Sequence, residues 1–456
     1  MAKLFGTDGI RGVVGDLITP EFTLRMGHAI GAYFGKGSRL LIGRDVRLGG
    51  DMIARSLTAG LLSEGIKVYD ANLLPTPALQ YGIKALGFDG GVMITASHNP
   101  PEYNGIKVIA GDGIEIPHEK EDIIESYYFN NYSSKIELRS YDNEVKVKEG
   151  IIDLYIDAVL NQVDVEKIAK RNFRVVVDCA NSVGSLTAPL LLKKLGVKAF
   201  TVNCNLDPYF PGRNPEPNAE TLQNTMNYIS LIKADAGFAH DGDADRAMIL
   251  DNNGRIQWGD RTGALLTEFT TKIWKKYNKK TYTAVSSSTL VEEYLKPKGI
   301  EVGWTPVGSV TIAREITKNK DAISGFEDNG GYMHVPHHTV RDGAMAIALI
   351  LYMLSEYNES LSNLYDKLPQ YYAIKTKIEA NRDQALCGVE AVKERYSSYK
   401  MITIDGVKVF GDDFWLLVRP SGTEPLLRIT GEAKTEKRIE GIINDTIKYI
   451  RSKCIR

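Results

Sequence analysis

Three aspartates, Asp241, Asp243 and Asp245, stand at alternate positions directly after an apolar segment. In an extended segment, side chains two residues apart point to the same side, so the three carboxylates would face one space. Oxygen-only ligands of this kind suit a hard cation such as Mg²⁺. An EF-hand loop is excluded, because its sixth position needs Gly and has Arg246, and its twelfth needs Glu and has Asn252. The pattern favours a Mg²⁺ site over the alternative, a solvated acidic turn.

A second polar loop, residues 95–100, places Ser97 directly beside His98. Neighbouring residues do not readily form the nucleophile–base pair of a hydrolase triad, and the sequence has no G-x-S-x-G segment. The residues alone leave two readings open, a reactive serine or a tight turn shaped by Ser, Asn and Pro. Lys107 could be a general base only if burial or nearby cations lowered its pKa; otherwise it is a surface lysine.

Residues 419–425 bring a guanidinium, two hydroxyls and a glycine backbone into one short loop. A phosphate monoester is bound by such donors, a bidentate guanidinium together with O–H and N–H groups. The loop is therefore interpreted as a phosphate site with the donors Arg419, Ser421, Gly422 and Thr423. Residues 5–12, which include Arg11, have a similar but weaker character, since glycines and one arginine also make a plain turn. Arg44 and Arg47 are more typical of solvated or structural arginines.

Helices alternating with strands must position these loops. Thr19 is a helix N-cap, Pro20 the first helical residue, and the helix is predicted to stop at Gly35. Its apolar stripe advances in steps of four through Phe22, Met26, Ile30 and Phe34. A buried-type strand at residues 39–42 and a second apolar stripe at residues 53–61 follow. This alternation predicts mostly parallel α/β sheets.

An internal repeat defines the architecture. Short strands that open into polar loops recur at residues 89–95, 235–239 and 321–325. Each is preceded by a glycine that ends a helix and leads into another strand, at residues 65–68, 196–199 and 299–302. Open α/β sheets bind ligands at the carboxyl ends of their strands, so three similar units would present three loops from equivalent strand ends.

Beyond residue 369 the pattern changes to that of a smaller α+β domain. Strands are predicted at residues 371–378, 414–418 and 426–429, followed by a last helix from Thr435. With a charged linker at residues 141–149 and a turn at residues 251–254, the chain divides into four predicted domains. Their bounds are 1–150, 151–253, 254–368 and 369–456.

Composition and charge exclude several classes. The chain has 456 residues, with 56 Lys plus Arg and 57 Asp plus Glu, and a formal net charge of −1. A nucleic-acid-binding surface spread over the protein would need an excess of cations, so we expect no nucleic-acid partner. No apolar run reaches the roughly 18 residues of a membrane span, and no signal-peptide core opens the chain. We expect a cytoplasmic protein with no membrane partner.

The four cysteines are scattered along the chain, at Cys179, Cys204, Cys387 and Cys454. They form no C-x-x-C pair, so we expect neither a disulfide framework nor a thiolate zinc site. The sequence leaves the oligomeric state open.

Together these loops resemble those of the α-D-phosphohexomutase superfamily, along essentially the whole chain and in the family's order. The matching segments are residues 96–100, 241–246, 327–331 and 419–425. The resemblance implies three similar mixed-sheet α/β domains and a smaller C-terminal α+β domain around a central cleft. It also implies that Ser97 is phosphorylated in the active enzyme and shares one Mg²⁺ with the three aspartates.

The same resemblance implies a phosphosugar mutase. Such an enzyme interconverts a hexose 1-phosphate and 6-phosphate through a hexose 1,6-bisphosphate, which serves as intermediate and activator. Lys107 would be the general base, and three further side chains would support the phosphoryl group electrostatically: Arg11, His98 and Arg246. Glu327 and Asn329 would bind sugar hydroxyls, and the loop of Arg419 would hold the non-reacting phosphate.

The sugar-recognition residues depart from the family pattern. Many members have Ser and His where this chain has Asn329 and Gly331, and Ser309 replaces a His of some phosphomannomutase/phosphoglucomutase members. Residues 5–12 and 419–428 resemble the phosphoglucosamine mutase branch, which makes glucosamine phosphate the favoured substrate. Thr95 is closer to the phosphomannomutase/phosphoglucomutase pattern, the alternative. An aspartyl-phosphate phosphatase with Asp241 as nucleophile and a non-catalytic sugar-phosphate sensor are more distant alternatives.

Overall fold

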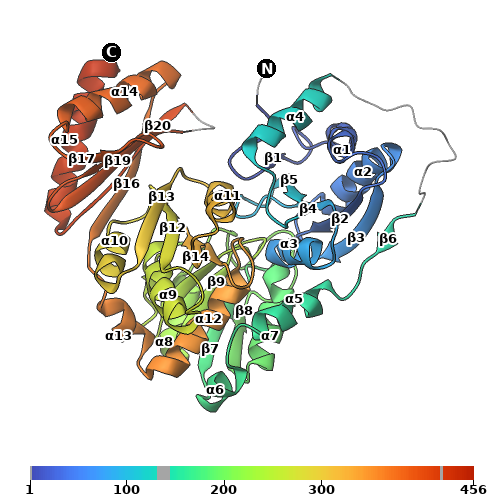
Figure 1. Cartoon of the computed structure of the whole chain (residues 1–456), viewed down its shortest axis with the longest axis horizontal. Coiled ribbons are helices and arrows are strands. Elements are labelled where there is room, and N and C mark those ends of the chain that lie inside the picture. Colours follow the sequence, from blue (N-terminus) through green and yellow to red (C-terminus); the bar gives the residue numbers. More distant parts are fainter. Residues whose placement is uncertain (1–2, 131–143, 422–424, 456) are drawn as a thin grey trace.

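The computed structural model describes residues 3–130, 144–421 and 425–455, which form four sheets in chain order (Figure 1). The first sheet, of domain I, has the order β1-β5-β4-β2-β3-β6. The sheet of domain II has the order β11-β10-β9-β7-β8, and that of domain III the order β13-β12-β14-β15. The predicted class of three mixed-sheet α/β domains and a smaller fourth domain is confirmed. The predicted domain boundaries stay predictions.

The three α/β domains share one topology. In each, the first strand pairs in parallel with the second on one side and with the third on its other side. The fourth strand then pairs antiparallel with the third. Domain I builds this pattern from β2 (Arg39–Arg44), β3 (Lys67–Leu73), β4 (Gly90–Ile94) and β5 (Tyr103–Ala110). Domain II uses β7 (Arg174–Asp178), β8 (Lys198–Val202), β9 (Ala236–His240) and β10 (Ala247–Asp251). Domain III uses β12 (Lys280–Ala284), β13 (Glu301–Thr305), β14 (Ser324–Phe326) and β15 (Tyr332–His334).

The three polar loops are the same connection in this shared topology. Residues 95–102 join β4 to β5, residues 241–246 join β9 to β10, and residues 327–331 join β14 to β15. Edge strands complete two of the sheets: β1 (Ile10–Val13), β6 (Lys146–Val147) and β11 (Ile256–Gln257). The repeat predicted from the sequence is therefore a repeat of structure.

Local signals explain the helices of domain I. Helix α1 (Pro20–Phe34) begins after Thr19, whose Oγ1 accepts a hydrogen bond from the Phe22 amide, and its C-cap is Gly35 at φ 85°. These bounds are the predicted ones. The other helices of the domain are α2 (Gly50–Ser63), α3 (Thr76–Ala85) and α4 (His118–Phe129).

Helices of domains II and III pack around one shared apolar core. Domain II contains α5 (Ile151–Leu160), α6 (Val165–Lys170), α7 (Ala188–Lys194) and α8 (Gln223–Ile232). The later ones are α9 (Gly259–Ile273), α10 (Leu290–Leu295), α11 (Ser309–Asn319), α12 (Gly343–Tyr357) and α13 (Leu361–Asp366). The largest core joins side chains of all three domains, and α12 is apolar on nearly every face because it lies inside that core.

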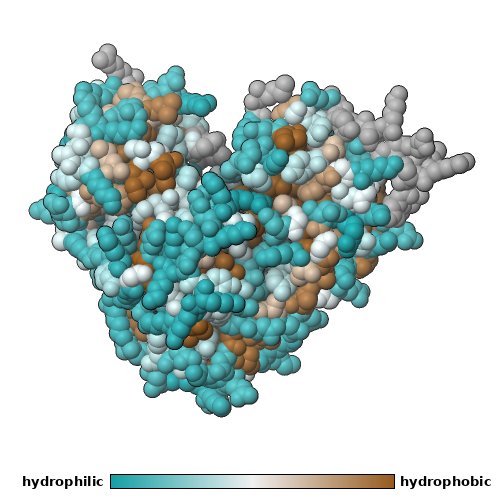
Figure 2. Space-filling model, viewed as in Figure 1, coloured by the Kyte–Doolittle hydropathy of each residue, from teal (hydrophilic) through white to brown (hydrophobic). Residues whose placement is uncertain are grey.

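Domain IV is an antiparallel sheet, β16-β20-β19-β18-β17, with its own core. Its strands are β16 (Tyr372–Glu379), β17 (Lys400–Ile402), β18 (Val407–Phe410), β19 (Phe414–Pro420) and β20 (Leu426–Ala433). Helices α14 (Arg382–Arg395) and α15 (Glu436–Cys454) pack on it. An open notch separates domain IV from domain I on the face drawn in Figure 2. In the part of the chain that the structure describes, no helix is long and apolar enough to cross a membrane.

The expectation that the cysteines form no disulfides is wrong. Cys179 and Cys204 form one disulfide with a Cα–Cα distance of 4.8 Å, and Cys387 and Cys454 form another at 5.7 Å. Cys179 follows β7 and Cys204 follows the adjacent parallel strand β8, while the second pair joins neighbouring helices α14 and α15. Tertiary neighbours bring the cysteines together, so their spacing in sequence carried no signal.

Candidate active site

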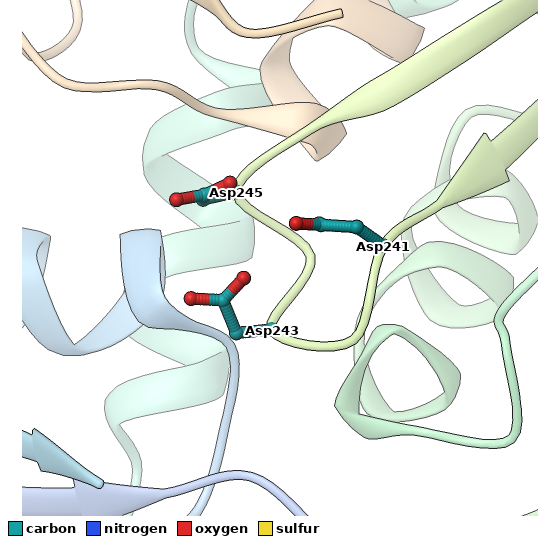
Figure 3. Close-up of side chains that lie close together, drawn as sticks. All are labelled: Asp241, Asp243 and Asp245. Carbon is teal, nitrogen blue, oxygen red and sulfur yellow. The ribbon is translucent and has the colours of Figure 1, made fainter. Parts of the chain in front are cut away.

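The three aspartates converge on one space at the carboxyl end of β9 (Figure 3). One oxygen of each of Asp241, Asp243 and Asp245 lies within 4.8 Å of the others, and all three side chains are buried. The reading as a solvated acidic turn is therefore wrong. Ala244 holds a φ of 58° between the last two aspartates, a strained value for a residue with a side chain.

Residues 95–102, named the serine loop, are held in place by the buried side chain of Arg47. Arg47 donates from Nη2 to the carbonyl oxygens of Ser97 at 2.5 Å and Asn99 at 2.7 Å, and from Nη1 to that of Pro100 at 2.8 Å. The carboxylate of Asp45 fixes Arg47 in turn, with 3.1 Å between Nε and Oδ2. Arg47 is thus structural, and it lets Ser97 keep a φ of 50°.

The hydroxyl of Ser97 contacts residues 241–246 of domain II, which carry the three aspartates and are named the metal loop after their predicted Mg²⁺ site. Its Oγ donates to Asp241 Oδ2 at 2.8 Å, and Arg246 Nη2 lies 3.5 Å from the same Oγ. His98 Nδ1 lies 3.4 Å from Oγ and also contacts Arg246. Burial and the guanidiniums of Arg246 and Arg11 lower the pKa of His98, so its imidazole is neutral at pH 7. The Ser97 hydroxyl therefore donates to one carboxylate and lies beside a guanidinium donor and a neutral imidazole.

Lys107 lies inside the acidic cluster. Its Nζ donates to Asp243 Oδ2 at 2.9 Å and to Asp245 Oδ2 at 3.2 Å. The side chain is buried, so the reading as a surface lysine is wrong. Against the effect of burial, these two carboxylates raise the pKa of the Lys107 ammonium, and the ammonium in turn lowers the pKa of Asp243. Lys107 is a charged donor in this state.

The carboxylate oxygens that remain fit a hard cation. Asp243 Oδ1 and Asp245 Oδ1 are buried and accept no hydrogen bond, whereas the Oδ2 atoms are used by Lys107. Burial together with the neighbouring carboxylates of Asp245 and Asp243 raises the pKa of Asp241 well above its usual range. The two buried carboxylate oxygens without hydrogen bonds can be stabilised by a bound divalent cation, and all-oxygen ligands suit Mg²⁺.

Arg11 contributes from the N-terminal segment. Its Nη1 donates to Asn99 Oδ1 at 2.9 Å, and its Nη2 lies 3.5 Å from Asp8 Oδ2. Asp8 also accepts from Ser309 Oγ at 3.1 Å, which links domain I to the start of helix α11. Burial opposes ionisation of Asp8, but Arg341 and Arg11 lower its pKa and keep it charged.

Residues 327–331, named the sugar loop after their predicted role, reach the same cluster through Arg341. Arg341 Nη1 donates to Glu327 Oε2 at 3.0 Å, and its Nη2 donates to Asp245 Oδ2 at 2.6 Å. Asn329 Oδ1 accepts from the amide of Gly331 at 3.3 Å, so this side chain is turned into its own loop. Of the two predicted sugar-binding residues, Glu327 is joined to the metal loop and Asn329 is not.

The predicted phosphate site, residues 419–425, belongs to domain IV. Arg419 Nη1 donates to Asp405 Oδ2 at 2.8 Å, and the Ser421 amide donates to the Leu426 carbonyl at 2.8 Å. Gly422 and Thr423, also predicted as phosphate ligands, lie outside the described residues. The structure thus brings together the predicted residues of domains I and II with Glu327 of domain III, while those of domain IV are on the other side of the notch.

Several residues of the site were not predicted. Arg341 directly precedes Asp342, the N-cap of α12, and Thr76 Oγ1 at the start of α3 donates to Asp243 Oδ2 at 2.7 Å. Asp405 lies in an Asp-Gly turn between β17 and β18, facing Arg419. Helix starts and hairpin turns can be read from sequence, but which loop they face cannot.

Comparison with known proteins identifies the family. Models of phosphoglucomutase/phosphomannomutase alpha/beta/alpha domains I, II and III match residues 2–135, 153–254 and 258–372. The model of the C-terminal domain of the same family matches residues 374–448.

Two curated relatives match over nearly their full length. A phosphoglucosamine/phosphogalactosamine mutase of Sulfurisphaera tokodaii is 51% identical, with 99% of this chain and 100% of the relative covered. A phosphoglucomutase/phosphomannomutase of Thermococcus kodakarensis is 42% identical, with 99% of each covered.

Two solved structures show the same fold. One, a phosphoglucomutase/phosphomannomutase family protein of Burkholderia thailandensis, has a TM-score of 0.86 at 24% identity, covering 99% of this chain and 97% of its own. The other, an Aspergillus fumigatus N-acetylphosphoglucosamine mutase in complex with GlcNAc-6P and magnesium, has a TM-score of 0.63 at 17% identity, covering 98% and 95%. Together with the four domain matches and the curated relatives, these findings show that the chain belongs to the phosphoglucomutase/phosphomannomutase family and is a phosphohexomutase.

Proposed function

We propose that this phosphohexomutase interconverts the 1-phosphate and 6-phosphate of a hexosamine, with glucosamine phosphate as the favoured substrate. The observation that carries the proposal is the contact of Ser97 Oγ with Asp241 Oδ2 at 2.8 Å, which joins the candidate phosphoserine to the acidic cluster of another domain. The relative at 51% identity is named for glucosamine and galactosamine phosphates, which supports the amino sugar. The relative at 42% identity supports the alternative, a phosphoglucomutase/phosphomannomutase.

The proposed step moves one phosphoryl group between two oxygens. The bond from phosphorus to Ser97 Oγ breaks, a bond from phosphorus to a sugar hydroxyl oxygen forms, and the hydroxyl proton ends on Ser97. The sugar 1,6-bisphosphate then turns around, and its other phosphate returns to Ser97. Arg11, His98 and Arg246 supply donors around the transferring group. Lys107 is proposed as the base. This role requires the pKa of the Lys107 ammonium to fall, which happens when the negative charge of Asp243 and Asp245 is neutralised.

We propose Mg²⁺ as the cofactor, held by Asp241, Asp243, Asp245 and the phosphorylated Ser97. Two buried carboxylate oxygens without hydrogen bonds support it, as does the magnesium named for the Aspergillus structure. Bound Mg²⁺ would neutralise charge on the transferring phosphoryl group. A sugar 1,6-bisphosphate is the proposed activator, because it would phosphorylate Ser97 at the start.

The remaining roles follow from the two outer loops. Glu327 and Asn329 are proposed to bind sugar hydroxyls. The non-reacting phosphate is assigned to Arg419, Ser421, Gly422 and Thr423. One phosphate clamp then serves both orientations of the sugar. The partner is thus a small phosphosugar, and we expect no nucleic-acid or membrane partner.

A cytoplasmic location is part of the proposal, since the sugar phosphates of metabolism are used there. The two disulfides are relevant to this location, because stable disulfides inside cells are common chiefly in hyperthermophilic archaea and bacteria. Fractionation of the source cells, followed by detection of the chain in the cytosolic or the envelope fraction, tests this location.

The function is tested by intact-protein mass spectrometry together with a kinetic panel. We expect one phosphate on Ser97 and the highest kcat/KM with glucosamine phosphate, when each hexose or hexosamine 1-phosphate is supplied with its own bisphosphate. Ser97→Ala should lose activity, whereas Ser126→Ala on the exposed face of α4 should not. Full mutase activity in Ser97→Ala would refute the mechanism. Release of inorganic phosphate without isomer would favour a phosphatase, and binding without turnover a sensor.

A further inference from the structure

Arg341 is a buried arginine whose backbone is fixed by a helix start. It directly precedes Asp342, whose side chain caps helix α12 by accepting from the Met345 amide at 2.9 Å. Only 3% of the Arg341 side chain is exposed. Its position therefore depends on the core of domain III rather than on a surface loop.

The guanidinium of Arg341 holds carboxylates from three domains. It contacts Asp245 Oδ2 at 2.6 Å in domain II, Glu327 Oε2 at 3.0 Å in domain III and Asp8 Oδ2 at 3.4 Å in domain I. A guanidinium has five N–H donors in a rigid plane and can serve several carboxylates at once, which the compact ammonium of lysine cannot do as well. Removing it would leave these buried carboxylates without their shared cation.

The sugar loop leaves room for this arginine. A Cβ on Gly331 would stand 2.4 Å from Arg341 Cδ, so residue 331 cannot carry a side chain while Arg341 keeps its place. Ser309, the second departure from the family pattern, donates to the carboxylate of Asp8 that Arg341 also contacts. Gly331 thus lies directly against Arg341, and Ser309 is linked to Arg341 through the carboxylate of Asp8.

We propose that Arg341 is a positioning residue that fixes the sugar-binding Glu327 relative to the metal-loop Asp245, and that Gly331 lacks a side chain in order to admit it. This inference rests on the proposed role of Glu327 in sugar binding. Arg341 takes the space in which many family members begin a histidine side chain. The chain therefore orients Glu327 through a cation shared with the metal loop.

Two double-mutant cycles test the inference. In the first, Arg341→Ala should lower kcat/KM at least tenfold in the wild-type background and less than threefold in Glu327→Gln, because its effect passes through Glu327. In the second, Gly331→Ala should lower the melting temperature of the wild type, and this loss should disappear in Arg341→Ala, where the clash is gone. The second cycle needs no activity.

The matched control is Arg314→Ala. Arg314 is another domain III arginine that holds domain I, through Asp112 at 2.5 Å, but it contacts neither the metal loop nor the sugar loop. We expect its kcat/KM within threefold of the wild type. If Arg341→Ala does not fold, Arg341→Lys replaces it and should show a smaller loss with the same dependence on Glu327.

Additive effects in both cycles, or an Arg341→Ala variant within twofold of wild type, would overturn the inference. A wild-type protein without phosphohexomutase turnover on any sugar phosphate would instead contradict the proposed function. In that case the melting-temperature cycle still decides whether Gly331 and Arg341 exclude each other's side chains.

Discussion

The backbone of Gly242 lies so close to that of Ser97 that a Cβ on Gly242 would stand 2.3 Å from the Ser97 carbonyl oxygen. Real Cβ atoms do not approach a backbone oxygen to that distance, so only glycine fits at this place. The contact joins the metal loop of domain II to the serine loop of domain I. It brings Asp241 within hydrogen-bond distance of the Ser97 hydroxyl.

Gly242→Ala should therefore separate the two loops and lower kcat/KM by about 100-fold, since a misplacement of about 1 Å costs a reaction that much. The control is Gly441→Ala on helix α15, where an added Cβ meets nothing within 4 Å. The control should keep full activity and gain up to about 1 kcal/mol of stability. Steady-state kinetics and thermal unfolding of both variants measure this. A Gly242→Ala enzyme within twofold of wild type would show that the loops need no close contact.

Asp405 ties Arg419, the proposed phosphate ligand, to domain III. Its Oδ2 accepts from Arg419 Nη1 at 2.8 Å and from the Val307 amide at 3.1 Å. In Asp405→Asn, Arg419 loses this charged partner and becomes less well oriented. We expect KM for the phosphosugar to rise about five- to tenfold with kcat within twofold, because the clamp binds ground state and transition state alike.

The matched control for this effect is Asp413→Asn, which breaks another aspartate–arginine pair of domain IV, with Arg438 at 3.0 Å on the exposed surface. Its KM should equal that of the wild type. A fall in KM in Asp405→Asn would mean that Asp405 competes with phosphate for Arg419, the opposite of the expected effect.

The disulfide between Cys387 and Cys454 closes a long segment of domain IV, because the two cysteines are 67 positions apart in the chain. Replacing both cysteines by serine should destabilise that domain by about 2–4 kcal/mol, because the unfolded chain gains freedom. Unfolding followed with and without reductant measures the loss, and the reduced wild type should match the variant. Free thiols at both positions in the native protein, found by alkylation and mass spectrometry, would contradict the disulfide.

How much of this protein could be read from its sequence depended on whether the signal was local. Helix α1 could be bounded from Thr19 and Gly35 because a cap and a stripe act within a few residues. The three polar loops were recognisable because each follows a strand in one repeated topology. The reach of these loops across domains was not readable: Ser97 and Asp241 are 144 residues apart, and Arg341 and Asp245 are 96 apart.

Burial was the other missing quantity. From the sequence, Lys107 could be either a general base or a surface lysine. Only the fold shows that its ammonium lies between two buried carboxylates, where its pKa rises instead of falling. The expectation of no disulfides was wrong for a different reason, because neighbouring strand ends and neighbouring helices bring the cysteines together in space. Arg47 held the serine loop through backbone carbonyls, a contact for which residue type gives no signal.

Part of the acid sensitivity should arise from His338, which is buried where domain III meets domain I. Its Nε2 lies 3.3 Å from the Asp112 carbonyl oxygen, and Gly113 packs against its ring. Burial, together with the charges of Lys84 and His337, lowers the pKa of His338 to about 3. An unfolded histidine has a pKa of about 6.5, so between these values the unfolded chain binds a proton that the folded protein does not. The stability is therefore complete above about pH 6.5 and falls as the pH drops, by about 1.4 kcal/mol per pH unit between roughly pH 6 and pH 4.

His338→Gln should flatten this dependence, so its melting temperature falls less than that of the wild type between pH 7 and pH 5. His118→Gln is the contrasting control, since the hydrogen bond with Glu121 raises the pKa of His118. That pair stabilises the fold below the unfolded pKa and loses its effect as the pH rises, so its removal should make the acid loss steeper. Parallel melting curves for His338→Gln and the wild type would exclude His338 as the source of acid sensitivity.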